Sequence, residues 1–201
     1  MPETMLHLLL RTLLFQLLRD IVGKTAAVGS EQFVYYNASD PQQCVAPDVF
    51  VKLGGDPTPF PIWKTWERGA PDLAIEMLSD SDADVWDKKV ARYHAIGVSE
   101  LVAFDVDAPP GMRLRVWDRV QDDLVEREIV DDSTPCATLG KYWVVRPAED
   151  LPAALRLADD AAGKVLVLSD REARKAEKVG REAAEARVTE LEAEIRKTRG
   201  R

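Results

Sequence analysis

The chain has 201 residues, of which 46% are hydrophobic and 31% are charged, which is enough for one hydrophobic core with appendages. The net charge of −8, from 27 Lys and Arg against 35 Asp and Glu, excludes a polycation that coats nucleic acid without specificity. Cys44 and Cys136 lie far apart, with no second thiol or histidine at metal-ligand spacing. Neither a disulfide framework nor a zinc site is indicated, and we expect a cytoplasmic protein.

The Leu-rich segment from Met5 to Val22 repeats its apolar residues at helical spacing and stops at Gly23. Arg11 and Arg19 interrupt it, and a central Arg costs roughly 2.5–3.5 kcal/mol on membrane-insertion scales. We therefore expect a buried helix and no membrane span. The alternative is a helix that contacts a partner or a membrane surface.

The middle of the chain alternates strand and helix patterns, which predicts an α/β fold. Strands are expected over 32–36, 47–53, 71–78 and 100–106, a helix over 84–96 after a turn at 79–82, and a hairpin from 113–118 and 124–130. Residues 60–69 are predicted to form a loop, and 141–146 and 164–168 short strands. The strand–helix–strand unit over 71–106 favours a parallel, right-handed crossover.

From Ser169 the composition changes to Ala, Glu, Lys and Arg, and Val188, Leu191 and Ile195 are the main large apolar residues. This predicts a long, solvated, charged helix. We expect two parts, a globular domain over 1–168 and the helix over 169–201. The apolar seam spans about two heptads, fewer than a stable coiled coil needs, so a short coiled coil and a homodimer stay open.

Glu76 stands inside an apolar strand pattern, where an uncompensated carboxylate is costly. It could lie at a sheet edge, or bond a backbone N–H or an Arg. Alternatively, Asp48 on a neighbouring strand would come within about 4.5–5.5 Å of it, near enough for the two carboxylates to share one divalent cation. Mg²⁺ or Mn²⁺ held in this way keeps positions open for water and phosphate, as a hydrolytic site requires. Asp72 lies four residues from Glu76 along the strand, too far to share the same ion, and is interpreted as a strand-entry residue.

A phosphodiester hydrolase also needs a cation near the attacked phosphate. Lys two residues after the Glu would serve, but position 78 is Leu. Lys89 lies on the inward side of the following helix, Lys88 is expected to point toward solvent, and Lys52 is a second candidate on the Asp48 strand. Each of these lysines could instead be an ordinary surface charge.

These motifs, taken in order, resemble a known family. Ala46-Pro47-Asp48-Val49, the Pro71–Ser79 strand, Lys89-Val90-Ala91-Arg92-Tyr93, Gly97-Val98 and Glu100–Asp105 are similar to the Uma-type restriction endonuclease family of the PD-(D/E)xK nuclease superfamily. The resemblance covers roughly 32–118.

The resemblance implies a restriction-endonuclease-like α/β core, with a central mixed β-sheet flanked by helices, and a metal-dependent phosphodiesterase site. Carried over by motif, Asp48 and Glu76 bind the metal and Lys89, four residues before Tyr93, assists the water. Glu31 is the nearest match to an early family Glu and is a candidate supporting residue.

Two functions from different classes follow. The first is a Mg²⁺- or Mn²⁺-dependent endonuclease with DNA as substrate. The second is an inactive nuclease-fold binding or scaffold protein, in keeping with the acidic composition and the charged C-terminal helix.

Two further sets of residues are of a type that contacts DNA or metal. The segment Trp63, Lys64, Trp66 and Arg68 could contact a phosphate backbone or stack a base. Alternatively, its tryptophans simply cover the core. His7 and His94 are interpreted as packing or surface residues.

Overall fold

The structure, a computed structural model, describes residues 4–78, 86–148 and 150–199. The chain forms two compact units, Met1–Val167 and Leu168–Arg201. The predicted turn at 79–82 and the predicted helix entry at 84–85 lie outside the described residues. No helix within the described ranges has both the length and the apolarity that a membrane span needs.

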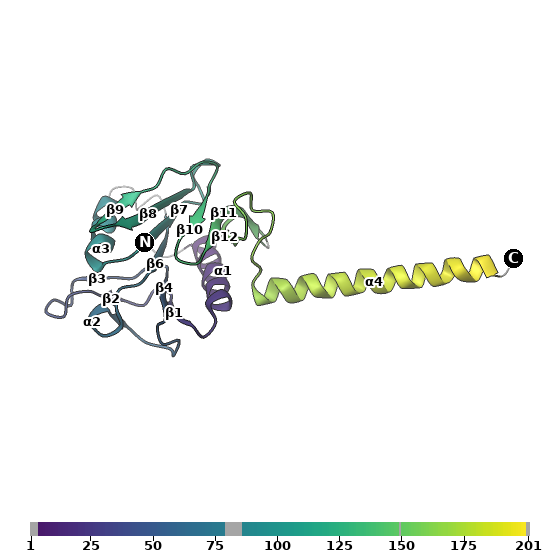
Figure 1. Cartoon of the computed structure of the whole chain (residues 1–201), viewed down its shortest axis with the longest axis horizontal. Coiled ribbons are helices and arrows are strands. Elements are labelled where there is room, and N and C mark those ends of the chain that lie inside the picture. The colour runs from purple at the N-terminus through teal and green to yellow at the C-terminus, as the bar shows by residue number, and fades with distance from the viewer. Residues whose placement is uncertain (1–3, 79–85, 149, 200–201) are drawn as a thin grey trace. The chain divides into compact units, whose positions relative to one another are not determined.

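A six-stranded mixed sheet forms the centre of the first unit (Figure 1). Its strand order is β1-β4-β6-β7-β8-β9. The strands are β1 (Ala26–Gly29), β4 (Val49–Leu53), β6 (Leu73–Met77), β7 (Glu100–Phe104), β8 (Leu114–Val120) and β9 (Asp123–Glu126). β6 and β7 are parallel and every other neighbouring pair is antiparallel. The α/β class and the parallel pairing across the strand–helix–strand unit are therefore confirmed.

The two faces of this sheet bury different side chains, as the alternation along a strand requires. Leu73, Ile75 and Met77 belong to a cluster that includes residues of α1 (Met5–Val22). Ala74 faces the other way, into a cluster with Tyr93 of α3 (Trp86–Ile96). The central sheet is thus covered by a helix on each face.

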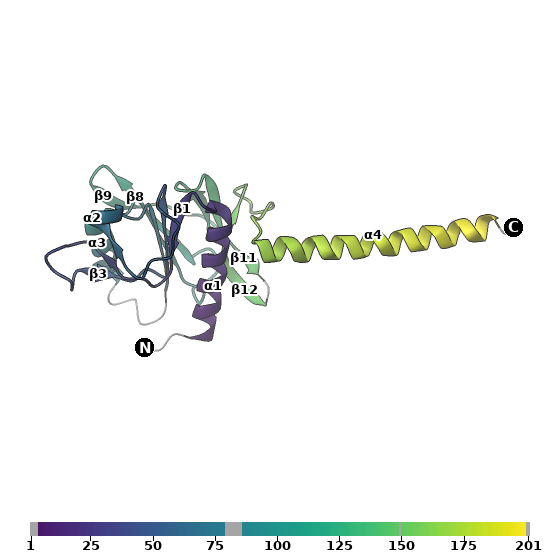
Figure 2. The ribbon, with the colours of Figure 1, turned by 90° about the horizontal axis from the view of Figure 1, so that it is seen from below.

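Helix α1 begins where Thr4 caps it, since the Thr4 side chain accepts a hydrogen bond from the His7 backbone N–H. It ends at Gly23, whose positive φ of 55° suits a residue without a Cβ. Leu10, Leu14, Leu17 and Leu18 are buried. The helix contacts the central sheet and also β12, as Figure 2 shows. The predicted buried helix over Met5–Val22 is confirmed.

Two smaller sheets complete the unit. One has the order β10-β11-β12, from Ser133–Cys136, Lys141–Ala148 and Leu151–Ala158. The other has the order β3-β2-β5, from Cys44–Val45, Val34–Tyr35 and Trp63–Lys64.

Two local predictions are wrong. The predicted loop over 60–69 contains β5 and the short helix α2 (Thr65–Arg68), because β5 pairs in parallel with β2. The predicted strand over 164–168 is reduced to a single bridge between Leu166 and Ala158.

The second unit consists mainly of α4 (Asp170–Arg199), one continuous helix of 30 residues (Figure 1). Ser169 and Glu172 form a capping box at its start. The Glu172 backbone N–H donates to Ser169 Oγ at 3.3 Å, and the Ser169 N–H donates to Glu172 Oε2 at 2.9 Å. The predicted long charged helix is confirmed.

Candidate active site

Glu76 lies in the interior of the central sheet. It is the fourth residue of β6, which is paired with β4 on one side and β7 on the other, so the sheet-edge alternative is excluded. Only 2% of the residue is exposed. A carboxylate buried so deeply needs specific partners.

Asp48 is brought beside Glu76 by the pairing of β4 with β6. The antiparallel register pairs Val49 with Ile75, and one further step sets Asp48 opposite Glu76. Asp48 Oδ2 accepts the Met77 backbone N–H at 2.6 Å, which fixes the carboxylate against the end of β6. The Asp48 carbonyl oxygen also accepts the Ser30 hydroxyl at 2.7 Å. The structure therefore brings together the two carboxylates that the sequence predicts as metal ligands.

Helix α3 supplies the other partners of Glu76. Lys89 Nζ lies 2.9 Å from Glu76 Oε2, and the Tyr93 hydroxyl donates to Glu76 Oε1. Lys89 and Tyr93 are four residues apart and so share one face of the helix. The Lys89 ammonium also lies 5.9 Å from the centre of the Trp86 ring. Of the three candidate lysines, Lys89 is the one that reaches the carboxylates.

The electrostatics of the site centre on Glu76. Burial raises its pKa to about 7, and the nearby charge of Asp48 also raises it, while Lys89 and the Tyr93 hydroxyl act in the opposite direction. Burial and the adjacent Glu76 raise the pKa of Tyr93 well above its ordinary value. Tyr93 therefore stays a hydrogen-bond donor near neutral pH, whereas Glu76 gains or loses its proton close to that pH.

His7, interpreted from the sequence as a packing or surface residue, contacts one of the candidate site residues. Its Nε2 lies 2.8 Å from Asp48 Oδ1. Both oxygens of Asp48 are thus held, one by a ring from α1 and one by the backbone of β6. No local pattern links His7 to Asp48 in the sequence, because the contact depends on how α1 packs on the sheet.

The other candidate residues have different partners. Lys52 Nζ lies 3.1 Å from Asp72 Oδ1, and Asp72 also accepts the Leu53 N–H, so this pair ties β4 to the entry of β6. Lys88 is exposed, as predicted. Glu31 forms an ion pair with Arg11 of α1.

The basic and aromatic segment after Phe60 divides into a buried and an exposed part. Trp63 is fully buried, and its Nε1–H donates to the Gly69 carbonyl at 2.8 Å. The Arg68 guanidinium lies over the Trp63 and Phe60 rings. Trp66 is 47% exposed. Trp63 is therefore a core residue, and Trp66 is the tryptophan available for an external contact.

A divalent cation fits the chemistry of the Asp48–Glu76 pair. Within the described residues, no group of three or more His, Cys, Asp and Glu side chains is arranged to hold a metal ion. Mg²⁺, however, is commonly bound through one or two carboxylates and keeps several waters. Two buried, adjacent carboxylates, one with a pKa raised in part by the other, are oxygen ligands whose excess charge such a cation would offset.

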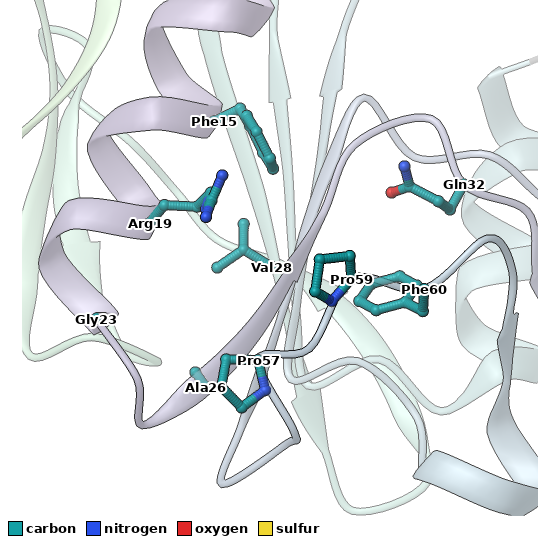
Figure 3. A pocket seen from close by; sticks show the side chains of 9 residues that line it. All are labelled: Phe15, Arg19, Gly23, Ala26, Val28, Gln32, Pro57, Pro59 and Phe60. Carbon is teal, nitrogen blue, oxygen red and sulfur yellow. The ribbon is translucent and has the colours of Figure 1, made fainter.

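A separate pocket lies along the C-terminal half of α1 (Figure 3). It encloses about 160 Å³ between α1, β1 and the loop at 57–60, and Arg19 lies over the Phe15 ring on its helix side. Its described lining includes none of the site residues above. The lining residues are Phe15, Arg19, Gly23, Ala26, Val28, Gln32, Pro57, Pro59 and Phe60.

Comparison with known proteins gives the family and the fold of the chain. The family model Uma2, described as "Putative restriction endonuclease", matches residues 1–158. The structure resembles the crystal structure of "a putative nuclease belonging to DUF820" from Anabaena variabilis, with a TM-score of 0.51 and 17% sequence identity over 70% of this chain and 76% of that chain. No curated protein matches the chain. At this identity the structural likeness shows the fold alone, a nuclease fold, and the resemblance found in the sequence is confirmed.

Proposed function

Because the chain belongs to the Uma2 family of restriction-endonuclease-like proteins, we propose that it is a Mg²⁺- or Mn²⁺-dependent DNA endonuclease. The observation that carries the proposal is the constellation of Asp48, Glu76 and Lys89. Asp48 directly precedes β4, Glu76 lies in β6 and Lys89 in α3, and the three converge at one end of β6, with Lys89 Nζ 2.9 Å from Glu76 Oε2. The nuclease fold and the family membership support the same reaction class.

Each residue has a distinct role in this proposal. Asp48 and Glu76 hold the cation through their carboxylate oxygens, which are hard ligands suited to Mg²⁺ and Mn²⁺. A cation held there would supply activation of a water and would offset charge on the phosphate. Lys89 donates to the attacking water or to a phosphate oxygen, where a fixed ammonium stabilises developing negative charge.

Tyr93 and His7 position the two carboxylates. The Tyr93 hydroxyl holds Glu76 Oε1, which leaves Oε2 as the oxygen shared with Lys89. His7 holds Asp48 Oδ1 while the Met77 N–H holds Oδ2. Partners of this kind orient ligands and tune their basicity.

Cleavage of supercoiled plasmid at low salt tests the proposal, with Mg²⁺, Mn²⁺ or EDTA present. We expect metal-dependent conversion to nicked or linear DNA, abolished by Glu76→Gln. Cleavage that survives Glu76→Gln would contradict the assignment. If the intact protein binds DNA but cuts none with either metal, the alternative function holds, an inactive nuclease-fold binding protein.

A further inference from the structure

Helix α4 presents an apolar seam that no described residue of its own unit covers. Every side chain from Ala173 to Arg196 is exposed. Val188, Leu191 and Ile195 are 55%, 41% and 52% exposed. Together with Ala184 they recur at spacings of four, three and four, so they lie along one side of the helix. At 30 residues the helix is about 45 Å long, and helices in water draw most of their stability from packing an apolar face.

We propose that α4 pairs with α4 of a second copy of this chain, parallel and in register, through the segment from Ala184 to Ile195. The types of residue along the seam select this arrangement. In heptad notation Val188 and Ile195 occupy a positions and Leu191 occupies the d position between them. β-branched residues at a with Leu at d favour parallel two-stranded coiled coils.

Charges beside the seam support the same orientation. In a parallel pair the g position faces the e position five residues later on the partner, which sets Arg187 opposite Glu192 on both sides of the dimer. An antiparallel pair with the same core would place Arg187 opposite Glu194, but also Glu185 opposite Glu192, where like charges repel. The charges therefore favour the parallel orientation.

Arg187 and Glu192 can exchange their ion pairs within the helix for ion pairs between two helices at little cost in free energy. Arg187 lies 2.5 Å from Glu190, and Glu192 lies 3.7 Å from Arg196, all within one helix. These side chains are more than half exposed, and ion pairs at the surface contribute little. They can be replaced by contacts between the two helices.

The seam is short, which sets the strength of the association. Toward the N-terminus from Ala184, the next a and d positions are Arg181 and Glu177, which cannot form an apolar core. The contact is thus limited to about four core layers, and we expect a dimer whose population rises with protein concentration.

Sedimentation of the full chain across a wide range of concentration tests the association. We expect the mass to rise from monomer toward dimer. Leu191→Lys places a charge in the seam and should weaken association by about tenfold or more. Ala186→Lys, on the opposite side of the helix, should leave it unchanged. Both sites are exposed in one copy, and circular dichroism verifies that the variants fold. A monomer at all concentrations, or equal loss in both variants, would overturn the proposal.

Disulfide trapping tests the orientation. In a Cys44→Ser background, Leu191→Cys should form a covalent dimer under mild oxidation, because d positions face each other in a parallel pair. Thr189→Cys, outside the seam, should not. A concentration-dependent dimer that fails to cross-link through Leu191→Cys, or that cross-links equally through Thr189→Cys, would refute the parallel, in-register arrangement.

Discussion

Lys89 Nζ and Glu76 Oε2 are 2.9 Å apart, although Lys89 belongs to α3 and Glu76 to β6. The helix returns over the strand and brings an ammonium to the place that a lysine two residues after the Glu would otherwise occupy. That position holds Leu78. The positively charged side chain of the candidate site therefore comes from the helix, through its packing on the sheet.

Removal of the Lys89 ammonium should strongly lower the rate of DNA cleavage. We expect Lys89→Ala to reduce kcat by about 10²–10³-fold, the range found when one electrostatic stabiliser of a transition state is removed. Plasmid cleavage under saturating Mg²⁺ measures the effect. Lys88→Ala, at an exposed position of the same helix, is the matched control and should cleave normally. Equal losses in both variants would contradict the role given to Lys89.

The stability of the metal-free protein should fall as pH rises, because of Glu76. Its pKa is raised from 4.5 to about 7 in the folded state, so between these values the folded state binds more protons than the unfolded state. The free energy of unfolding then decreases with pH over this window, and the full penalty, about 3 kcal/mol, is reached above about pH 7.

Urea unfolding in EDTA, at several pH values between 4 and 8, measures this dependence. Glu76→Gln should flatten it, because the glutamine does not titrate. Glu67→Gln serves as the control, since Glu67 is about half exposed and paired with Lys64, and it should leave the slope unchanged. An unchanged slope in Glu76→Gln would show that Glu76 titrates near its ordinary value.

His7→Ala should weaken the binding of divalent metal, although His7 is not assigned as a ligand. Loss of a group that orients a ligand typically costs 10–100-fold in metal affinity or activity, and His7 holds Asp48 Oδ1. Calorimetric titration with Mn²⁺ measures the change in metal affinity. His94→Ala is the control, because His94 is partly exposed and contacts the Asp122 carbonyl instead. Unaltered Mn²⁺ affinity in His7→Ala would remove His7 from the site.

Lys52→Ala should leave catalysis intact. Lys52 pairs with Asp72 at a distance of 3.1 Å, and both side chains are a quarter exposed, so the variant should lose about 1–3 kcal/mol of stability. Thermal unfolding measures the loss of stability, and plasmid cleavage by the same variant measures its catalysis. A cleavage defect as large as that of Lys89→Ala would reassign the catalytic lysine to Lys52.

The sequence predicts the part of the site that follows from strand alternation and strand pairing. The period of two along β6 separates Glu76 from Ile75 and Met77, and the pairing of β4 with β6 then brings Asp48 beside it. Helical spacing likewise relates Lys89 to Tyr93. The two spacings follow from local geometry, whereas the pairing of β4 with β6 is a hypothesis, and the structure contains this pairing.

Contacts that depend on packing between distant elements could not be predicted. His7 reaches Asp48 only because α1 lies against the sheet. β12, with its run of Ala and Leu, has residues that favour helix, yet it is a strand because it pairs with β11. β1 is four residues long and contains two alanines, and it too is fixed by its neighbour, β4.

Binding of Mn²⁺ to the intact protein tests most directly the claim that Asp48 and Glu76 together hold one divalent cation. Calorimetric titration of the wild type, Asp48→Asn, Glu76→Gln and the double variant measures it. One site in the wild type, lost in each single variant and with no further loss in the double variant, is the result that we predict. Binding that is unchanged in both single variants would contradict the shared site and the metal-dependent mechanism built on it.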